Sequence, residues 1–299
     1  MTARVATVGT FDGLHRGHRA IIDKLKHIAA ETGLTTALIT FKAHPLSTIA
    51  PQRCPATVMG RDEVESSLKT LGIEDVEMLD FTASLASLTA RQFLAMLRQR
   101  FDVHHLVMGF DNTFGSDRLT LHDDYTAAAR AEGIDITFVD PILTADGRKI
   151  SSSLLRHALR DGDMPLAREC TGTWPRLTGK VVHGKENGRK LGFPTMNISP
   201  HHPLPLRRGA YIATMDYDGH TYHGVLNVGH NPTFGDENSL TYEFHVPDID
   251  LGDMYGKTIT VDILKFLREE KKFASLDELS AAIKANINEM KNYFTNSNI

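Results

Sequence analysis

Two histidines stand three residues apart in the segment Gly9-Thr10-Phe11-Asp12-Gly13-Leu14-His15-Arg16-Gly17-His18, which joins an apolar run to a helical pattern. Its glycines allow a tight turn and a close approach of the backbone to a phosphate, and the helix that follows presents free N–H groups to an anion. His15 and His18 can face one phosphate and stabilise charge that develops on its oxygens. A metal-binding pair or two surface histidines are the alternatives, but no nearby cysteine or carboxylate cluster would complete a metal site. The segment therefore predicts a site for a reacting phosphate.

Three consecutive serines, Ser151, Ser152 and Ser153, precede Arg156 at the expected start of a helix. Serine hydroxyls and free N–H groups at such a start can hold phosphate oxygens, and Arg156 can add a bidentate charged contact. Ordinary helix capping is the alternative for three serines alone. Beside the histidine segment, phosphate binding is the favoured interpretation.

A third segment, residues 179–197, combines four glycines with four lysines or arginines. Glycines free the backbone to wrap phosphates, and the cations offset their charge. The segment has neither the Walker A pattern nor the catalytic loop of a protein kinase. Thr195 and Asn197 offer oxygens on the same side of an extended chain, and such ligands suit Mg²⁺ that shares its shell with phosphate. A basic hairpin without a ligand is the alternative. The candidate binding residues are Gly179, Lys180, Gly184, Lys185, Gly188, Arg189, Gly192, Pro194, Thr195 and Asn197.

The elements that must position these residues differ between the two halves of the chain. Apolar runs at 5–8, 35–41, 106–109 and 134–139 alternate with helical periodicity at 20–29, 61–71, 89–101 and 123–131. Such alternation predicts an α/β domain with a mostly parallel sheet, and ligands bind at the carboxyl ends of its strands.

After about residue 174, short runs of period two are separated by Gly, Pro, Asn and Asp. Strands are predicted at 177–182, 210–217, 222–228, 240–246 and 258–266, and this pattern is typical of an antiparallel sheet or small barrel. Ser275 and Glu278 form a capping box for a final helix. We expect domains at 1–160 and 176–299, joined by a linker at 161–175.

Composition excludes several classes of protein. The 299 residues include 33 Lys+Arg and 37 Asp+Glu, a net charge of −4 that argues against a general nucleic-acid binder. Cys54 and Cys170 fit no metal or redox spacing, and no run approaches the roughly 20 apolar residues that span a bilayer. The start of the chain lacks the apolar core of a signal peptide. We expect a cytoplasmic protein without a membrane or nucleic-acid partner; the sequence does not predict its oligomeric state.

The motifs together resemble one enzyme family. The histidine segment resembles the nucleotidyltransferase signature, in the form found in bacterial FAD synthetases and some cytidylyltransferases. Ile150–Arg156 is similar to the element that ends the FAD synthetase module. The string Gly-Arg-x-x-Gly-Phe-Pro-Thr-x-Asn, at 188–197, resembles the riboflavin kinase signature, with Met196 in place of the usual Ala. Matching segments run from Val5 to about Ile287, in the family's order. The chain thus resembles the bacterial bifunctional riboflavin kinase/FAD synthetase family.

The resemblance implies a Rossmann-like nucleotidyltransferase domain followed by a riboflavin-kinase-like β-barrel with a C-terminal helix. It implies ATP as co-substrate at both sites, Mg²⁺, and riboflavin and FMN as the other substrates. His15 and His18 would stabilise charge during adenylyl transfer, and Glu243 would take the proton of the riboflavin hydroxyl during phosphorylation. For Glu243 the alternative is a solvent-facing strand glutamate.

Binding roles follow from the same resemblance. Arg268 and Glu269 would contact the flavin in the kinase domain, unless they form only a charged surface turn. The residues assigned to the nucleotide of the adenylyltransferase domain are Gly9, Thr10, Phe11, Asp12, Gly17, His44, Asp111, Ser151, Ser152, Ser153 and Arg156.

Three departures from the family pattern keep an alternative open. Lys42 and Ala43 alter the segment before His44, and Thr113 stands where the family often has arginine. The N-terminal domain of a riboflavin kinase could therefore be inactive or act on another substrate. A flavin- or nucleotide-binding regulator without turnover is a third hypothesis, and the intact motifs at both sites argue against it.

Overall fold

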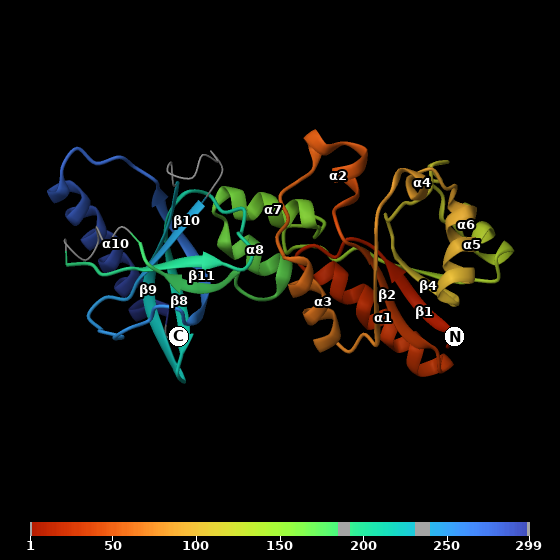
Figure 1. Cartoon of the computed structure of the whole chain (residues 1–299), viewed down its shortest axis with the longest axis horizontal. Helices are drawn as coiled ribbons and strands as arrows, with labels where there is room; N and C mark the ends of the chain where they lie inside the picture. The colour runs from red at the N-terminus through yellow and green to blue at the C-terminus, as the bar shows by residue number, and fades with distance from the viewer. Residues whose placement is uncertain (1, 185–191, 231–239, 298–299) are drawn as a thin grey trace. The chain divides into compact units, whose positions relative to one another are not determined.

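The computed structural model describes residues 2–184, 192–230 and 240–297 (Figure 1). Contacts divide the chain into two compact units, Met1–Ser152 and Ser153–Ile299. The domain boundary at 160 and the linker at 161–175 remain predictions. The lysine and arginine expected at 185 and 189, with the glycine at 188, lie outside the described residues.

The first unit is a five-stranded parallel sheet in the order β3-β2-β1-β4-β5. This topology confirms the predicted Rossmann-like α/β domain. Its strands are β1 (Arg4–Val8), β2 (Thr35–Phe41), β3 (Asp75–Leu79), β4 (Val103–Gly109) and β5 (Asp135–Val139). Its helices are α1 (Arg16–Thr32), α2 (Pro45–Ile49), α3 (Arg61–Thr70), α4 (Ala83–Ala86), α5 (Ala90–Phe101) and α6 (His122–Ala131), with a short 3₁₀ turn, η1 (Pro51–Arg53).

Helices cover both faces of this sheet, because successive strand residues point to opposite sides. Val5 of β1 packs in a buried cluster with α1 and α3, whereas the next residue, Ala6, packs in a second cluster with α5 and α6. Central strands covered on both faces need the near-continuous apolar runs that the sequence has at 35–41 and 103–109.

The second unit is a closed antiparallel barrel in the order β10-β7-β6-β11-β8-β9. This confirms the predicted barrel and its C-terminal helix. The strands are β6 (Arg176–Val182), β7 (Met196–Pro200), β8 (Gly209–Tyr217), β9 (His220–His230), β10 (Leu240–His245) and β11 (Thr258–Glu269). The helices are α7 (Ser152–Asp161), α8 (Met164–Thr171) and α10 (Leu276–Ser297).

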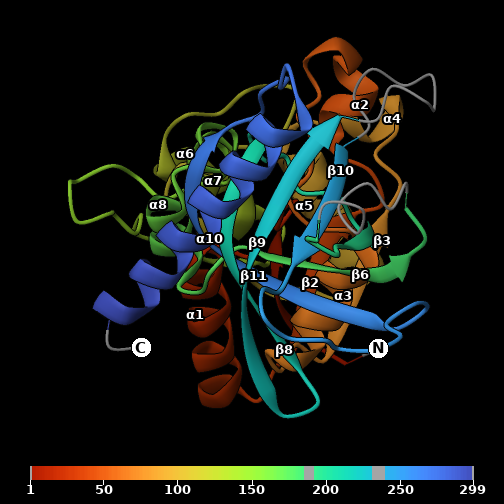
Figure 2. The same ribbon diagram turned by 90° about the vertical axis from the view of Figure 1, so that its left-hand side faces the viewer.

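The barrel core and the surface against which α10 packs lie on opposite faces of the same strands. Ala210 and Ile212 of β8 pack with Ile287 and Met290 of α10, whereas Tyr211 between them is fully buried on the other face. Figure 2 shows α10 running alongside the barrel strands. Over the described residues, no helix is both long enough and apolar enough to cross a membrane.

Candidate active sites

The first candidate site lies where the winding of the parallel sheet changes direction, between β1 and β4. Open α/β sheets bind ligands outside the carboxyl ends of their strands at such a point. A cavity of about 240 Å³ is found there. The predicted residues Gly9, Thr10, Phe11, His15, Gly17, His18, Asp111, Ser151 and Ser152 all line it.

The two histidines are held together at the start of α1. The His15 side chain caps the helix by accepting a hydrogen bond from the backbone N–H of His18, 3.3 Å away. The two imidazole rings stack with their centroids 3.6 Å apart and an interplanar angle of 19°. The N–H groups of a helix start and both rings therefore face one small polar cavity.

His18 has the electrostatic properties of a neutral hydrogen-bonding group. Burial, together with the neighbouring charge of His15, holds the pKa of His18 well below its usual value of 6.5. Its Nδ1 atom is buried and has no hydrogen-bond partner among the described residues. A buried polar atom normally finds a partner, so this nitrogen is available to hydrogen-bond a ligand in the cavity.

The loop between β1 and α1 is fixed from several directions. Phe11, Gly13 and Leu14 all have positive φ, which makes the turn tight. The carboxylate of Asp12 is buried and accepts hydrogen bonds from the N–H groups of Val58 and Met59, at 2.8 and 3.1 Å. Asp12 does not line the cavity, so its contacts support a positioning role for this predicted nucleotide-binding residue.

The serine segment meets the same loop, as the motif predicts. The hydroxyl of Ser152 donates to the backbone carbonyl of Asp12 at 2.9 Å. Two motifs that are 140 residues apart in the sequence are therefore joined at one cavity. Ser153 is exposed and Arg156 is buried, and both belong to the second unit.

His44, which was predicted to contact the nucleotide, lies at the start of α2. It caps α2, and its Nδ1 accepts a hydrogen bond from the backbone N–H of Leu46 at 3.1 Å. His44 lines neither this polar cavity nor a second cavity that adjoins it.

A second, largely apolar cavity of about 370 Å³ adjoins the first and shares Gly9, Thr10 and Asn112 with it. Its walls include the aromatic side chains of Phe41, Phe81, Phe93 and Phe114. Phe81 belongs to none of the sequence motifs, and it follows β3, a strand that the sequence pattern did not predict. A polar and an aromatic cavity thus meet at the end of β1.

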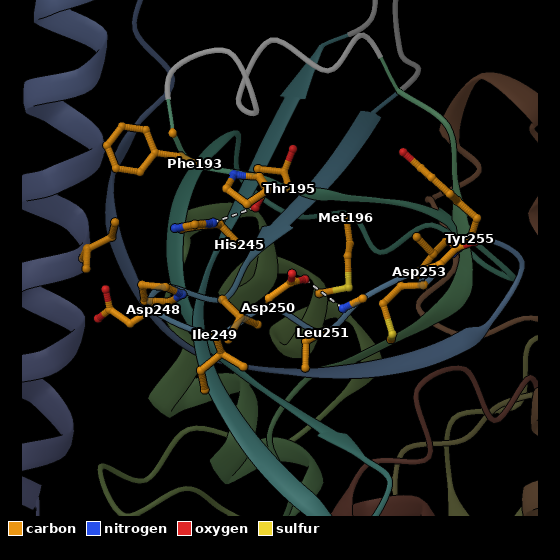
Figure 3. Close-up of a pocket in the computed structure, with 18 of the residues that line it drawn as sticks. Phe193, Thr195, Met196, His245, Asp248, Ile249, Asp250, Leu251, Asp253 and Tyr255 are labelled. Carbon is orange, nitrogen blue, oxygen red and sulfur yellow. Dashed lines mark hydrogen bonds between the residues drawn. The ribbon is translucent and has the colours of Figure 1, made fainter.

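In the barrel unit, a cavity of about 860 Å³ is lined by Gly192–Met196, by residues 245–255 and by α10 (Figure 3). His245 hydrogen-bonds through Nδ1 to the carbonyl of Pro194 at 2.7 Å, which holds the segment that carries Thr195. The predicted residues Gly192, Pro194 and Thr195 therefore line one cavity.

The register of the barrel brings Glu243 to the kinase motif. Glu243 of β10 pairs directly with Asn197 of β7 on one side and with Asn227 of β9 on the other. Directly opposite side chains share a face, with Cβ atoms about 5 Å apart. Glu243 is half-buried, and its neighbours Tyr242 and Phe244 point to the barrel core.

Two glycines of the motif allow close backbone packing. A Cβ atom on Gly184 would lie 2.1 Å from the amide nitrogen of Asn197, and one on Gly179 would lie 2.3 Å from the carbonyl oxygen of Ser199. Lys180, between them on β6, is exposed. Gly184 therefore leaves room for the Asn197 amide beside Glu243.

Arg268 and Glu269 make different side-chain contacts, and the flavin contact predicted for them stays a prediction. Arg268 donates to the Asn286 side chain of α10 at 3.3 Å, and its burial lowers its pKa. Glu269 forms an ion pair with Arg207. Neither residue lines the 860 Å³ cavity.

Comparison with known proteins agrees with this division. The family model described as FAD synthetase matches residues 1–154, and the one described as riboflavin kinase matches residues 171–294. A bifunctional riboflavin kinase/FMN adenylyltransferase from Pseudomonas fluorescens is 35% identical, over 95% of this chain and 90% of its own length. The enzyme of the same name from Bacillus subtilis is 33% identical, over 98% and 93%.

The chain belongs to the bifunctional riboflavin kinase/FMN adenylyltransferase family. The predicted kinase and nucleotidyltransferase activities are thereby confirmed at the level of the family. A solved structure from Streptococcus pneumoniae, described as a macrolide-efflux protein, is 31% identical with a TM-score of 0.84. That alignment covers 97% of this chain and 94% of the other.

The departures from the pattern of this bifunctional family lie away from the histidines. Lys42 is exposed and pairs with Asp80 at 2.8 Å, and Ala43 is exposed. Thr113 lines the aromatic cavity, so a shorter polar side chain there leaves more room between the aromatic walls. None of the three lines the polar cavity.

Proposed function

We propose that this chain phosphorylates riboflavin to FMN in the barrel unit and adenylylates FMN to FAD in the α/β unit, with ATP as co-substrate in both steps. The observation that carries the second assignment is the buried, unpartnered Nδ1 of His18 at the start of α1. The register of Glu243 with Asn197 supports the first.

In the adenylylation step, a phosphate oxygen of FMN attacks the α-phosphorus of ATP. The bond from this phosphorus to the bridging oxygen breaks, and pyrophosphate leaves. The nucleophile is already anionic, so no strong base is required. A neutral His18 donates a hydrogen bond to the phosphate chain, and the N–H groups of α1 stabilise the charge that develops there.

The two adjoining cavities divide the substrates by their chemistry. The polar cavity beside His15, His18 and Ser152 suits the phosphates of ATP. The aromatic cavity suits the flat ring system of FMN, because aromatic side chains bury and stack on such rings. Their shared residues follow the ends of β1 and β4, and the two phosphate groups would meet there.

In the kinase step, Glu243 accepts the proton of the ribityl hydroxyl as the hydroxyl oxygen attacks the γ-phosphorus of ATP. The bond from this phosphorus to the β–γ bridging oxygen breaks, and ADP leaves. Thr195 and Asn197 fit Mg²⁺, because they offer hard oxygen donors, and Gly184 leaves room around the Asn197 amide that a Cβ atom would fill. When bound, Mg²⁺ would neutralise charge on the transferred phosphate. Thr195 and Asn197 then orient the phosphates relative to Glu243.

The place of action and the partners remain expectations. Cys54 and Cys170 are both thiols in the described structure, which agrees with a reducing cytoplasm. We expect riboflavin, FMN and ATP as partners, and neither nucleic acid nor a membrane.

A product time course of the His18→Ala variant tests the assignment of the two sites. Formation of FAD from FMN should fall about 100- to 1000-fold, because a preorganised donor to the transition state is lost. Formation of FMN from riboflavin should stay at the wild-type rate. If both activities fell together in a folded variant, two separate sites would be the wrong model. FMN without any FAD from the wild-type chain would favour a kinase whose first unit has another role.

A further inference from the structure

The polar cavity of the α/β unit has an unusual charge balance for a site that receives a triphosphate. Two carboxylates line it, those of Asp111 and Asp140. His18 contributes no positive charge near neutral pH, because its pKa is well below the usual value. Of the described residues that line the cavity, Lys149 is the only lysine or arginine. Among the described residues that line the cavity, Lys149 is therefore the side chain with a permanent positive charge for the phosphates, beside His15 and the α1 N–H groups.

Lys149 is held over the cavity by a tight hairpin. Its backbone forms a β-bridge with Leu143, and next to it the N–H of Ile150 donates to the carbonyl of Ile142 at 2.9 Å. The turn of the hairpin is closed by the N–H of Thr144, which donates to the carbonyl of Arg148 at 2.8 Å. The position of Lys149, directly before the Ile150–Ser152 segment, is thus fixed by backbone contacts.

The Lys149 side chain forms an ion pair with Asp111, and both residues line the cavity. Both side chains are partly exposed, at 41% and 57%, so the pair is accessible to solvent. Exposed ion pairs contribute little to stability, and their partners exchange readily for a stronger anion. A polyphosphate entering the cavity would be such an anion.

We propose that Lys149 is a phosphate ligand of the adenylylation site and that Asp111 holds it until the nucleotide enters. This inference rests on the proposed function of the cavity. On entry of ATP, the ammonium group leaves the Asp111 carboxylate and pairs with phosphate oxygens. When the bond between the α-phosphorus and the bridging oxygen breaks, the pyrophosphate gains negative charge, and Lys149 stabilises that leaving group.

Steady-state kinetics of the full chain carrying Lys149→Met test this role, with Arg148→Met as the matched control. Arg148 is the adjacent residue of the hairpin, but its side chain pairs with Asp146 at 2.7 Å and does not line the cavity. Lys149→Met should raise the KM for ATP in FAD formation about 10- to 100-fold. The KM for pyrophosphate in the reverse reaction should rise similarly. Lys149→Arg should restore most of the loss, and Arg148→Met should behave like the wild type.

Each variant also provides an internal control, which is its rate of riboflavin phosphorylation. Riboflavin phosphorylation takes place in the other unit and should be unchanged in every variant. Asp111→Asn should lower the KM for ATP, because it releases Lys149. If Asp111→Asn raised that KM, the holding role of Asp111 would be refuted.

The outcomes separate this inference from the proposed function. If Lys149→Met stayed within about twofold of Arg148→Met while His18→Ala abolished FAD formation, Lys149 would not be a phosphate ligand and only this inference would fail. If His18→Ala also left FAD formation intact, the cavity would not be the adenylylation site and both proposals would fail.

Discussion

At the scale of single residues, the lowered pKa of His18 should make the free energy of unfolding depend on pH. Below pH 6.5 the unfolded chain binds a proton at His18, whereas the folded chain binds it only at lower pH. The free energy of unfolding should therefore fall as the pH drops from 6.5 towards the folded pKa, by at most about 1.4 kcal/mol per pH unit. His18→Gln should reduce this slope in calorimetric scans of the ligand-free protein. His27→Gln, at an exposed position on α1, is the control and should leave it unchanged.

Glu243 gives a second prediction at this scale. Glu243→Gln keeps the size of the side chain but cannot take a proton from the ribityl hydroxyl. The kcat for FMN formation should fall about 100- to 10,000-fold, and FAD formation from added FMN should be unaffected. Radiolabelled phosphate transfer from ATP to riboflavin measures the loss. Near-normal transfer by the Gln variant would reduce Glu243 to an ordinary strand residue.

The residue scale also separates what the sequence can predict about a site from what it cannot. His15, His18 and Ser152 line one cavity. Each of their two motifs combines backbone geometry with chemical groups within a short segment, so the sequence can predict it. The ligand contacts expected of His44 and Arg268 stay predictions, and their side chains contact Leu46 and Asn286 in the described structure. Lys149 lies directly beside a predicted motif but is not part of it. Its ion pair with Asp111 is a contact that only the structure reveals.

At the scale of elements, the predictable strands were those whose burial produces a clear pattern. β2 has the predicted bounds, because six of its seven residues are buried. β3 was not predicted: it is an edge strand, with acidic residues and one buried position. β7 was also missed, because it is five residues long and ends in proline. Pairing with β6 and β10 stabilises β7, and such tertiary contacts are invisible in a local pattern.

The segment predicted as a linker contains a helix that the local pattern did not indicate. Residues 161–175 contain α8, which begins with a cap from Asp163 to the N–H of Leu166 at 3.0 Å and ends at Gly172 with φ of 81°. Both are ordinary helix boundary signals. Eight residues with one apolar stripe are short enough to be taken for a connection.

The end of β6 gives a prediction for an element. Gly184→Ala would push its Cβ against the Asn197 amide, 2.1 Å away, and so displace a proposed Mg²⁺ ligand. The apparent Mg²⁺ requirement of FMN formation should rise severalfold. Gly219→Ala is the control: its φ of 76° is strained for alanine, but no atom lies within 4 Å of the new Cβ. It should cost about 1 kcal/mol of stability and leave the Mg²⁺ requirement unchanged. Equal effects of both variants would mean that Gly184 acts only through stability.

At the scale of the whole molecule, each unit has its own core and its own cavity. The described clusters around β1 contain only residues of the first unit, and the cluster under α10 contains only residues of the second. The two cavities described in the α/β unit and the cavity described in the barrel unit are likewise each lined by residues of one unit. A change in one active site should therefore leave the chemistry of the other intact.

This independence predicts that two inactive variants complement each other in a mixture. His18→Ala can form FMN but not FAD, and Glu243→Gln can form FAD only when FMN is supplied. With riboflavin and ATP, neither variant alone should produce FAD at more than a few per cent of the wild-type rate. The mixture should produce it after a lag, because FMN released by the first variant must reach the second through solution. The lag should shorten as the concentration of His18→Ala rises, and chromatography should detect FMN before FAD. A mixture that accumulates FMN and forms no FAD, although Glu243→Gln converts added FMN, would mean that FMN made in the barrel unit is not released.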